Sequence, residues 1–330
     1  LYKGEEPVEY AAILPTRYEH TEGYHIEPVD SISTVLEQFY ASRSLYTRMR
    51  QKSVDLRKIV STHLERSSKK LDLQLKQLKD TEKRDKFKVY GELLNTYGYQ
   101  VTEGAKSVEV PNYYTGEMLT IPLDETLSPL DNAKKYFARY NKLKRTFEAL
   151  NTQTEETRTE IAHLQTIQAA LAIAESEDDL AQIRDELETY GYIRRKMNGK
   201  KNQKFKSKPF HYRSSDGFDI YVGKNNFQND ELTFKVANGN DWWFHAKGMP
   251  GSHVIVKTEG RELPDRTFEE AGRLAGYYSS GRDNEKIEID YLQRKNVKKP
   301  NGAVAGYVIY YTNYSLTIHP DISGIEKISE

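Results

Sequence analysis

The sequence contains no cysteine in its 330 residues. This absence excludes disulfides, thiolate metal ligands and a cysteine nucleophile, and it is typical of a reducing compartment. There is no apolar run long enough to cross a membrane, and residues 1–9 lack the basic start and apolar stretch of a secretory signal. A Walker loop, a dinucleotide fingerprint and a Gly-x-Ser-x-Gly elbow are missing too. We therefore expect a cytoplasmic protein that is not an enzyme and needs no cofactor.

Charge is abundant but unevenly placed. Charged residues make up 30% of the chain and hydrophobic residues only 37%, which favours elongated helices over one large core. Residues 1–193 carry 26 basic and 32 acidic groups, residues 209–330 carry 15 and 17, and residues 194–208 carry 8 and none. This basic linker contains Asn, Gly, Gln and Ser, as a loop does. It is either a solvated hinge or a clamp on RNA phosphates, whose binding would depend steeply on salt.

The first part of the chain is predicted to be a helical arm. Residues 1–32 show no clear period and are expected to be extended, whereas residues 33–193 are mostly helical. From residue 33 to about 88, Leu64, Leu71 and Leu78 lie seven apart with Leu75 in the adjacent stripe. A second helical stretch runs from about residue 130 to 189 and ends in a shorter helix. The two long helices are expected to pair as an antiparallel coiled coil.

The connector between these helices, residues 91–129, contains two short alternating runs. Ser107–Val110 and Met118–Pro122 flank the turn sequence Asn112–Gly116. Alternation around an Asn/Gly turn predicts a small β element. It is either a cap that closes the arm or a contact module, with Tyr113 and Tyr114 as contacts.

From residue 209 the period changes to two, which predicts strands. The expected strands cover residues 218–222, 232–236, 242–246, 253–256, 287–291, 304–311 and 316–318. A helix opened by a capping box at Thr267–Glu270 lies among them. The predicted fold is therefore α+β: a long coiled-coil arm with a small β element, followed by a compact α+β domain over residues 209–330.

Amide side chains are concentrated on one segment of this domain, which we expect to be a loop between strands. The segment carries Lys224, Asn225, Asn226, Gln228, Asn229 and Asp230. A purely structural turn is one interpretation, because Asn and Asp bond nearby backbone. Since one turn does not need so many amides, the other is recognition of base edges or a peptide backbone.

Aromatic and histidine side chains follow on the next two strands. Within Asp241–His245, alternation places Trp243 and His245 on the face opposite Trp242 and Phe244. If that face were exposed, Trp243 and His245 could stack on unpaired bases, although core packing is the commoner role. Ser252 and His253 complete this predicted surface. We expect no metal, because the histidines lack the compact spacing of zinc ligands, and no catalytic triad.

A second basic cluster lies near the carboxy end of the domain. Lys295, Lys298 and Lys299 precede Pro300, and a loop there would let Lys298 and Lys299 face the same phosphate groove. Solvated loop lysines are the plainer interpretation. Together with Lys224 and the basic linker, they would form the positive side of an RNA site.

Several blocks of this sequence resemble the NFACT family, and they occur in the family's order. Beside Gly223–Asp230, Asp241–His245 and Gly251–Val254, they are Asp30-Ser-Ile-Ser33, Tyr90-Gly-Glu-Leu-Leu94, Ser128-Pro, Asn132-Ala133, Tyr140-Asn-Lys142 and Val297-Lys-Lys-Pro300. The sequence departs from the family at Trp242, where Leu or Ile is usual. It also opens at Leu1 without the Asp-Arg motif of the amino-terminal NFACT domain, so we expect a carboxy-terminal fragment that lacks this domain.

The resemblance implies a role in bacterial ribosome-associated quality control, a branch of protein biosynthesis. Family members of the RqcH type bind obstructed large ribosomal subunits with their nascent chain and tRNA, and they promote alanine tailing. The implied partners are rRNA and tRNA. Because related proteins are called fibronectin-binding proteins, a bacterial surface adhesin for fibronectin or fibrinogen is the alternative. A purely structural coiled-coil scaffold would leave the amide and Trp-Phe-His clusters unexplained.

Overall fold

A computed structural model describes residues 1–3, 6–14, 16–18, 21, 23–194 and 207–328. Most of the basic linker, residues 195–206, lies outside the described residues. The chain divides into two compact units, one formed by Leu1–Leu64 with Ala162–Glu330 and the other by Glu65–Ile161. Each unit is described by itself below.

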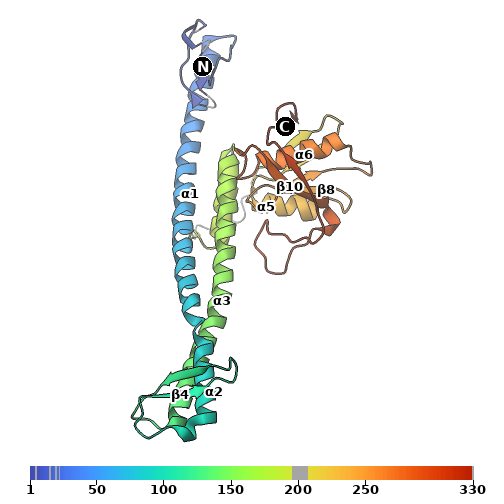
Figure 1. The fold of residues 1–330 in the computed structure, drawn as a ribbon. Coiled ribbons are helices and arrows are strands. Elements are labelled where there is room, and N and C mark those ends of the chain that lie inside the picture. The colour runs from blue at the N-terminus through green and yellow to red at the C-terminus, as the bar shows by residue number, and fades with distance from the viewer. Residues whose placement is uncertain (4–5, 15, 19–20, 22, 195–206, 329–330) are drawn as a thin grey trace. The chain divides into compact units, whose positions relative to one another are not determined.

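Helices form most of the amino-terminal half of the chain (Figure 1). They are α1 (Ile32–Thr81), α2 (Arg84–Tyr97), α3 (Pro129–Ile173) and α4 (Glu177–Thr189). The predicted helical stretches are therefore confirmed, except that the first is divided between α1 and α2. Before α1, the short strands β1 (Tyr2–Lys3), β2 (Glu6–Pro7) and β3 (Tyr24–His25) form a small antiparallel sheet, with a 3₁₀ turn at Thr16–Tyr18.

In the first unit, α1 packs against the end of α3 and against α4. Leu56 and Val60 of α1 share a buried cluster with residues of α3 and α4, among them Leu164, Ile167 and Leu187. Arg57 donates a hydrogen bond of 2.6 Å to the carbonyl of Leu171, and Lys52 contacts Glu177 at 2.6 Å. As the residue number rises along α1 from Lys52 to Arg57, the number of its partner falls from Glu177 to Leu171, so α1 runs antiparallel to the chain it contacts.

In the second unit, α2 and the start of α3 pack against the two-stranded sheet of β4 (Ser107–Pro111) and β5 (Met118–Pro122). Tyr90, Leu93 and Leu94 of α2 form its core with Val110, Ile121 and Ala133. Gly116 adopts φ of +78° in the turn, a conformation that strongly favours glycine. The predicted β element is confirmed.

The helix pair of the second unit has an unusual seam. Leu71 and Leu78 are half-buried as the heptad predicts, but Leu75 is exposed. The fully buried positions of α1 here are Ser67, Gln74 and Thr81, and α3 contributes Thr154 and Thr157. The side-chain oxygens of Gln74 and Thr154 have no hydrogen-bond partner among the described residues. This stretch of the coiled coil is therefore polar inside.

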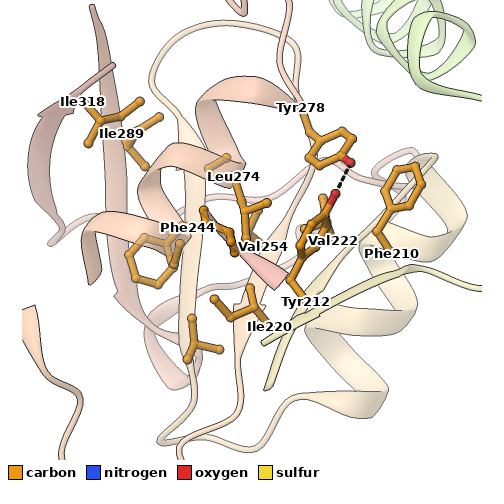
Figure 2. Close-up of a cluster of buried hydrophobic side chains, with 14 of the residues drawn as sticks. Phe210, Tyr212, Ile220, Val222, Phe244, Val254, Leu274, Tyr278, Ile289 and Ile318 are labelled. Carbon is orange, nitrogen blue, oxygen red and sulfur yellow. Dashed lines mark hydrogen bonds between the residues drawn. The ribbon is translucent and has the colours of Figure 1, made fainter. Parts of the chain in front are cut away.

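The carboxy-terminal domain of the first unit is built on a seven-stranded antiparallel sheet. Its spatial order is β11-β10-β8-β9-β7-β6-β12, with bounds β6 Phe210–Arg213, β7 Asp219–Val222, β8 Trp242–Ala246, β9 Val254–Val256, β10 Ile287–Gln293, β11 Tyr314–Ile318 and β12 Glu326–Lys327. Helix α6 (Asp265–Tyr277) packs on one face. Figure 2 shows the buried cluster there, including Phe244, Leu274 and the hydrogen-bonded hydroxyls of Tyr212 and Tyr278.

The opposite face of the sheet is covered by short helical segments and by the chain that follows β10. Helix α5 (Asn226–Glu231) continues into a π-helical turn, Leu232–Val236. Leu232 packs there with Trp243, Ile255, Leu292 and Val297 in a second buried cluster. The sheet is thus apolar on both faces, and the predicted α+β class is confirmed.

Three local predictions are wrong. Residues 232–236 form a π-helical turn, because Leu232 reaches the core from a helix that continues α5. Residues 304–311 are not a strand beyond one isolated bridge between Lys298 and Ile309. The capping box at Thr267–Glu270 does not form, since α6 begins at Asp265 and Glu270 accepts hydrogen bonds from Ser215 instead.

Candidate nucleic-acid interface

The amide-rich segment is a buried helix start, not an exposed loop. Asn225 caps α5, because its side-chain oxygen accepts a hydrogen bond of 3.0 Å from the backbone N–H of Gln228. Asn225, Asn226, Gln228 and Asn229 are each at most 3% exposed. The loop prediction is therefore wrong, and these amides face the protein interior.

The buried amides join the sheet domain to α3 and α4. Asn225 and Gln228 both donate to the side-chain oxygen of Gln182, at 2.6 and 2.8 Å, and Gln228 also donates to Ser207. Asn226 donates to Thr166 at 2.8 Å and to Glu186 at 2.7 Å. We call this set the polar clasp: Asn225, Asn226 and Gln228 with Thr166, Gln182, Glu186 and Ser207. The surplus of amides is explained by partners on distant elements.

Glu186 is the charged centre of the polar clasp. One carboxylate oxygen contacts both the amide of Asn226 and Nε2 of His163, at 2.7 and 2.9 Å. The other oxygen is buried and has no hydrogen-bond partner among the described residues. Because a buried carboxylate is costly unless it is paired, the contacts from Asn226 and His163 are important for docking the domain.

Asn229 instead stabilises the sheet domain itself. Its side-chain oxygen accepts a hydrogen bond of 3.0 Å from the backbone N–H of His253, and the same amide group lies against Gly223. A side chain at position 223 would collide with Asn229. The Gly223–Asp230 block is therefore held together by packing as well as by hydrogen bonds.

Trp243 and His253 are buried and form a ring cluster with the half-buried His245. Trp243 is 0% exposed, its ring stacks on His245 at a centroid distance of 5.5 Å, and it meets His253 edge-on at 5.1 Å. Burial lowers the pKa of His245, and burial together with the neighbouring His245 lowers the pKa of His253 well below the ordinary value. Stacking of bases on Trp243 is thus excluded in this structure, and both imidazoles are neutral at pH 7.

Two predicted cations are engaged within the protein. The ammonium of Lys224 lies 3.3 Å from the carboxylate of Asp179 and 4.5 Å from the ring of Phe210. Lys299 forms an ion pair with Asp230, which also accepts a hydrogen bond from the backbone of Gly306. Lys299 can therefore face a phosphate groove together with Lys298 only if it leaves Asp230. Ser252 is buried as well, its backbone N–H donating to the carbonyl of Tyr278.

Lys295 and Lys298 are the predicted cations that remain available. Both are exposed, and neither has an ion-pair partner among the described residues. Their backbones are fixed, because Lys295 donates to Gly239 and Lys298 exchanges two hydrogen bonds of 2.9 Å with Ile309. Ile309, the bridge partner of Lys298, lies two residues from Tyr307 and from Tyr311, two exposed tyrosines that the sequence pattern placed only in a predicted strand. The residues of the polar clasp on α3 and α4 were also missed, since no local pattern identifies a distant partner.

Within the described ranges, no helix is long and apolar enough to span a membrane. Among the same residues, no group of histidine and acidic side chains could hold a metal ion.

Family comparisons agree with this architecture. A model of the NFACT N-terminal and middle domains matches residues 1–206, and a model of the NFACT protein RNA binding domain matches residues 208–310. The chain belongs to the NFACT family. The first match covers the start of the chain, so the expectation that the amino-terminal NFACT domain is missing is not supported. The boundary between the two matches falls within the basic linker.

Several curated NFACT proteins are similar over most of this chain. Proteins named Rqc2 homolog RqcH are 39% identical in Streptococcus suis and 35% in Bacillus subtilis, each over 91% of this chain. The alignments cover 54% and 53% of those proteins, so the chain spans about half the length of the curated relatives it matches. A solved structure is also similar: the C-terminal part of the fibronectin/fibrinogen-binding protein from Streptococcus suis, with a TM-score of 0.66 and 33% identity, covering 85% of this chain and all of that one.

Proposed function

We propose that this chain is the RNA- and ribosome-binding part of an RqcH-like quality-control factor. The match of residues 208–310 to an NFACT RNA binding domain carries the proposal, and the similarity to RqcH proteins supports it. Its partner is the large ribosomal subunit that holds an obstructed nascent chain and tRNA. In the whole protein this binding supports alanine tailing, while the ribosome forms the peptide bonds, so the chain itself acts in the cytoplasm by binding and not as an enzyme.

The exposed cations give this function a physical basis. Lys295 and Lys298 are solvent-accessible and have no acidic partner among the described residues, so they can neutralise phosphates without breaking an internal ion pair. Lys299 and Lys224 would first have to leave Asp230 and Asp179. We therefore assign the phosphate contacts of this domain to Lys295 and Lys298, with the basic linker as a further contact.

Co-sedimentation with purified large subunits over a salt series tests this function. Lys298→Glu should weaken binding several-fold and lower the steepness of its salt dependence, because one phosphate contact is lost and a repulsion is added. Lys286→Glu is the matched control, since Lys286 is exposed in the same domain at the opposite end of β10. If the wild-type chain does not sediment with subunits, or if both variants behave alike, the assignment fails.

A fibronectin-binding adhesin is the second candidate. Its support is the similarity to the fibronectin/fibrinogen-binding protein of Streptococcus suis. Dose-dependent binding to immobilised fibronectin that survives Lys298→Glu would favour it. Loss of both activities in the same variant would show that one surface serves both.

A further inference from the structure

Two exposed tyrosines lie on either side of a β-bridge made by Lys298. The bridge joins Lys298 to Ile309, and Tyr307 and Tyr311 are two residues before and two residues after Ile309. Their side chains are 48% and 81% exposed. Val308 and Tyr310 pack inward against the cluster of Trp243, whereas Tyr307 and Tyr311 are exposed to solvent. Both tyrosine rings are therefore accessible, one before and one after the residue that pairs with Lys298.

The backbone that carries these tyrosines is fastened at both ends. Before Tyr307, Gly306 donates to Asp230 at 2.9 Å and Ala305 donates to the hydroxyl of Tyr190 at 2.7 Å. Gly306 also has φ of +76° and lies against Asn226, so a side chain there would collide with it. These contacts hold the backbone before Tyr307 in position, and the carboxylate of Asp230 is occupied by Gly306 and Lys299.

The buried carboxylate of Asp290 holds the chain on both sides of Tyr311. It accepts hydrogen bonds from Tyr310 at 2.8 Å, from Asn313 at 2.8 Å and from Ser315 at 2.7 Å. Tyr311 lies between two of these donors. Because the positions of both tyrosine backbones are fixed in advance, binding to their rings costs little conformational entropy.

We propose that Tyr307 and Tyr311 form a stacking surface for unpaired nucleotides, with Lys298 contacting the phosphate between them. Exposed aromatic rings beside a cation without an acidic partner match the chemistry of single-stranded RNA, whose bases are free to stack. Two separate rings beside one phosphate-binding cation suit a segment of single strand better than an isolated base. This inference rests on the proposed function and specifies its ligand.

The experiment compares a labelled single-stranded oligoadenylate with a hairpin duplex, using the whole 330-residue chain and fluorescence anisotropy. Tyr307→Ala with Tyr311→Ala should lower affinity for the single strand about tenfold and leave the salt dependence unchanged. The corresponding Phe variants should bind like wild type, because stacking uses the ring and not the hydroxyl. Tyr99→Ala is the matched control, since Tyr99 is also 81% exposed.

The outcomes separate this inference from the proposed function. Unchanged single-strand affinity in the Ala variants overturns the stacking surface, while salt-sensitive subunit binding by wild type would still support the proposed function. Equal losses for single strand and duplex overturn the inference too, because a stacking surface discriminates between them. Loss of subunit binding with unchanged RNA affinity would make the tyrosines a protein contact. A wild-type chain that binds neither RNA nor subunits contradicts both proposals.

Discussion

At the scale of single residues, the chemistry of the Trp-Phe-His segment is determined by burial. His245 and His253 lie on the inward face with ring centroids 5.6 Å apart, and Nδ1 of His253 is 2.7 Å from the hydroxyl of Thr233. Charging two neighbouring imidazoles, of which His253 is fully buried, would carry a large cost. They therefore act as packed polar groups, and the exposed lysines remain the cations for the proposed RNA partner.

His253 should make the domain sensitive to acid. Its folded-state pKa lies well below the ordinary value of 6.5, so the unfolded chain binds a proton more readily. Neutral His253 therefore contributes fully to stability above pH 6.5, the ordinary pKa. This contribution is lost as the pH falls from about 6.5 towards the folded-state pKa, by up to about 1.4 kcal/mol per pH unit for one proton. Urea unfolding between pH 7 and pH 5 measures the loss.

His253→Gln should flatten this pH dependence, although the variant is less stable overall because the contact with Thr233 changes. His319→Gln is the control, since His319 is exposed. An identical pH slope in wild type and His253→Gln would show that another group controls the acid sensitivity.

At the scale of secondary-structure elements, the coiled coil is not uniform. In the first unit, Leu56 and Val60 bury apolar side chains between the helices, whereas in the second unit the equivalent seam positions are Ser67, Gln74 and Thr81. A polar seam stabilises a helix pair less and specifies its register more. The second unit therefore relies on the core of Tyr90, Leu93 and Ile121 for its stability.

Replacing the buried amide of this seam should stabilise the protein. Gln74→Leu removes a buried oxygen that has no hydrogen-bond partner among the described residues, and it adds apolar contact. We expect the free energy of unfolding to rise by about 1–2 kcal/mol, measured by urea titration. Gln77→Leu makes the same change at an exposed position and should not stabilise. A destabilised Gln74→Leu variant would mean that the amide has a partner in solution.

Elements with strong local patterns could be predicted from the sequence. The leucines at 64, 71 and 78 identified α1, and the Asn/Gly turn between β4 and β5 identified the small β element. The secondary structure of Leu232–Val236 could not be predicted from its alternating apolar residues. Such residues can reach the buried cluster from a strand or, as here, from a π-helical turn. The partners of Asn225 and Asn226 could not be predicted either, since Gln182 and Glu186 belong to a helix more than 35 residues earlier in the chain.

At the scale of the whole molecule, the sheet domain contains its own cores. The buried residues of the cluster on the α6 side all come from residues 210–325. Those of the cluster on the opposite face all come from residues 232–297. Helices α3 and α4 add the hydrogen bonds of the polar clasp to this domain. Docking is thus largely polar, whereas folding of the domain depends on apolar burial.

We therefore expect residues 207–330 to fold alone, with a melting temperature lower by roughly 5–15 °C than in the whole chain, because the hydrogen bonds of the polar clasp are lost. Asn226→Ala provides the decisive comparison by thermal circular dichroism. Its amide donates to Thr166 and Glu186, both outside the isolated domain, so the substitution should destabilise the whole chain by about 1–3 kcal/mol and the isolated domain far less. An equal cost in both, or an isolated domain without a folded baseline, would show that the helices are part of its fold and not a surface to which it docks.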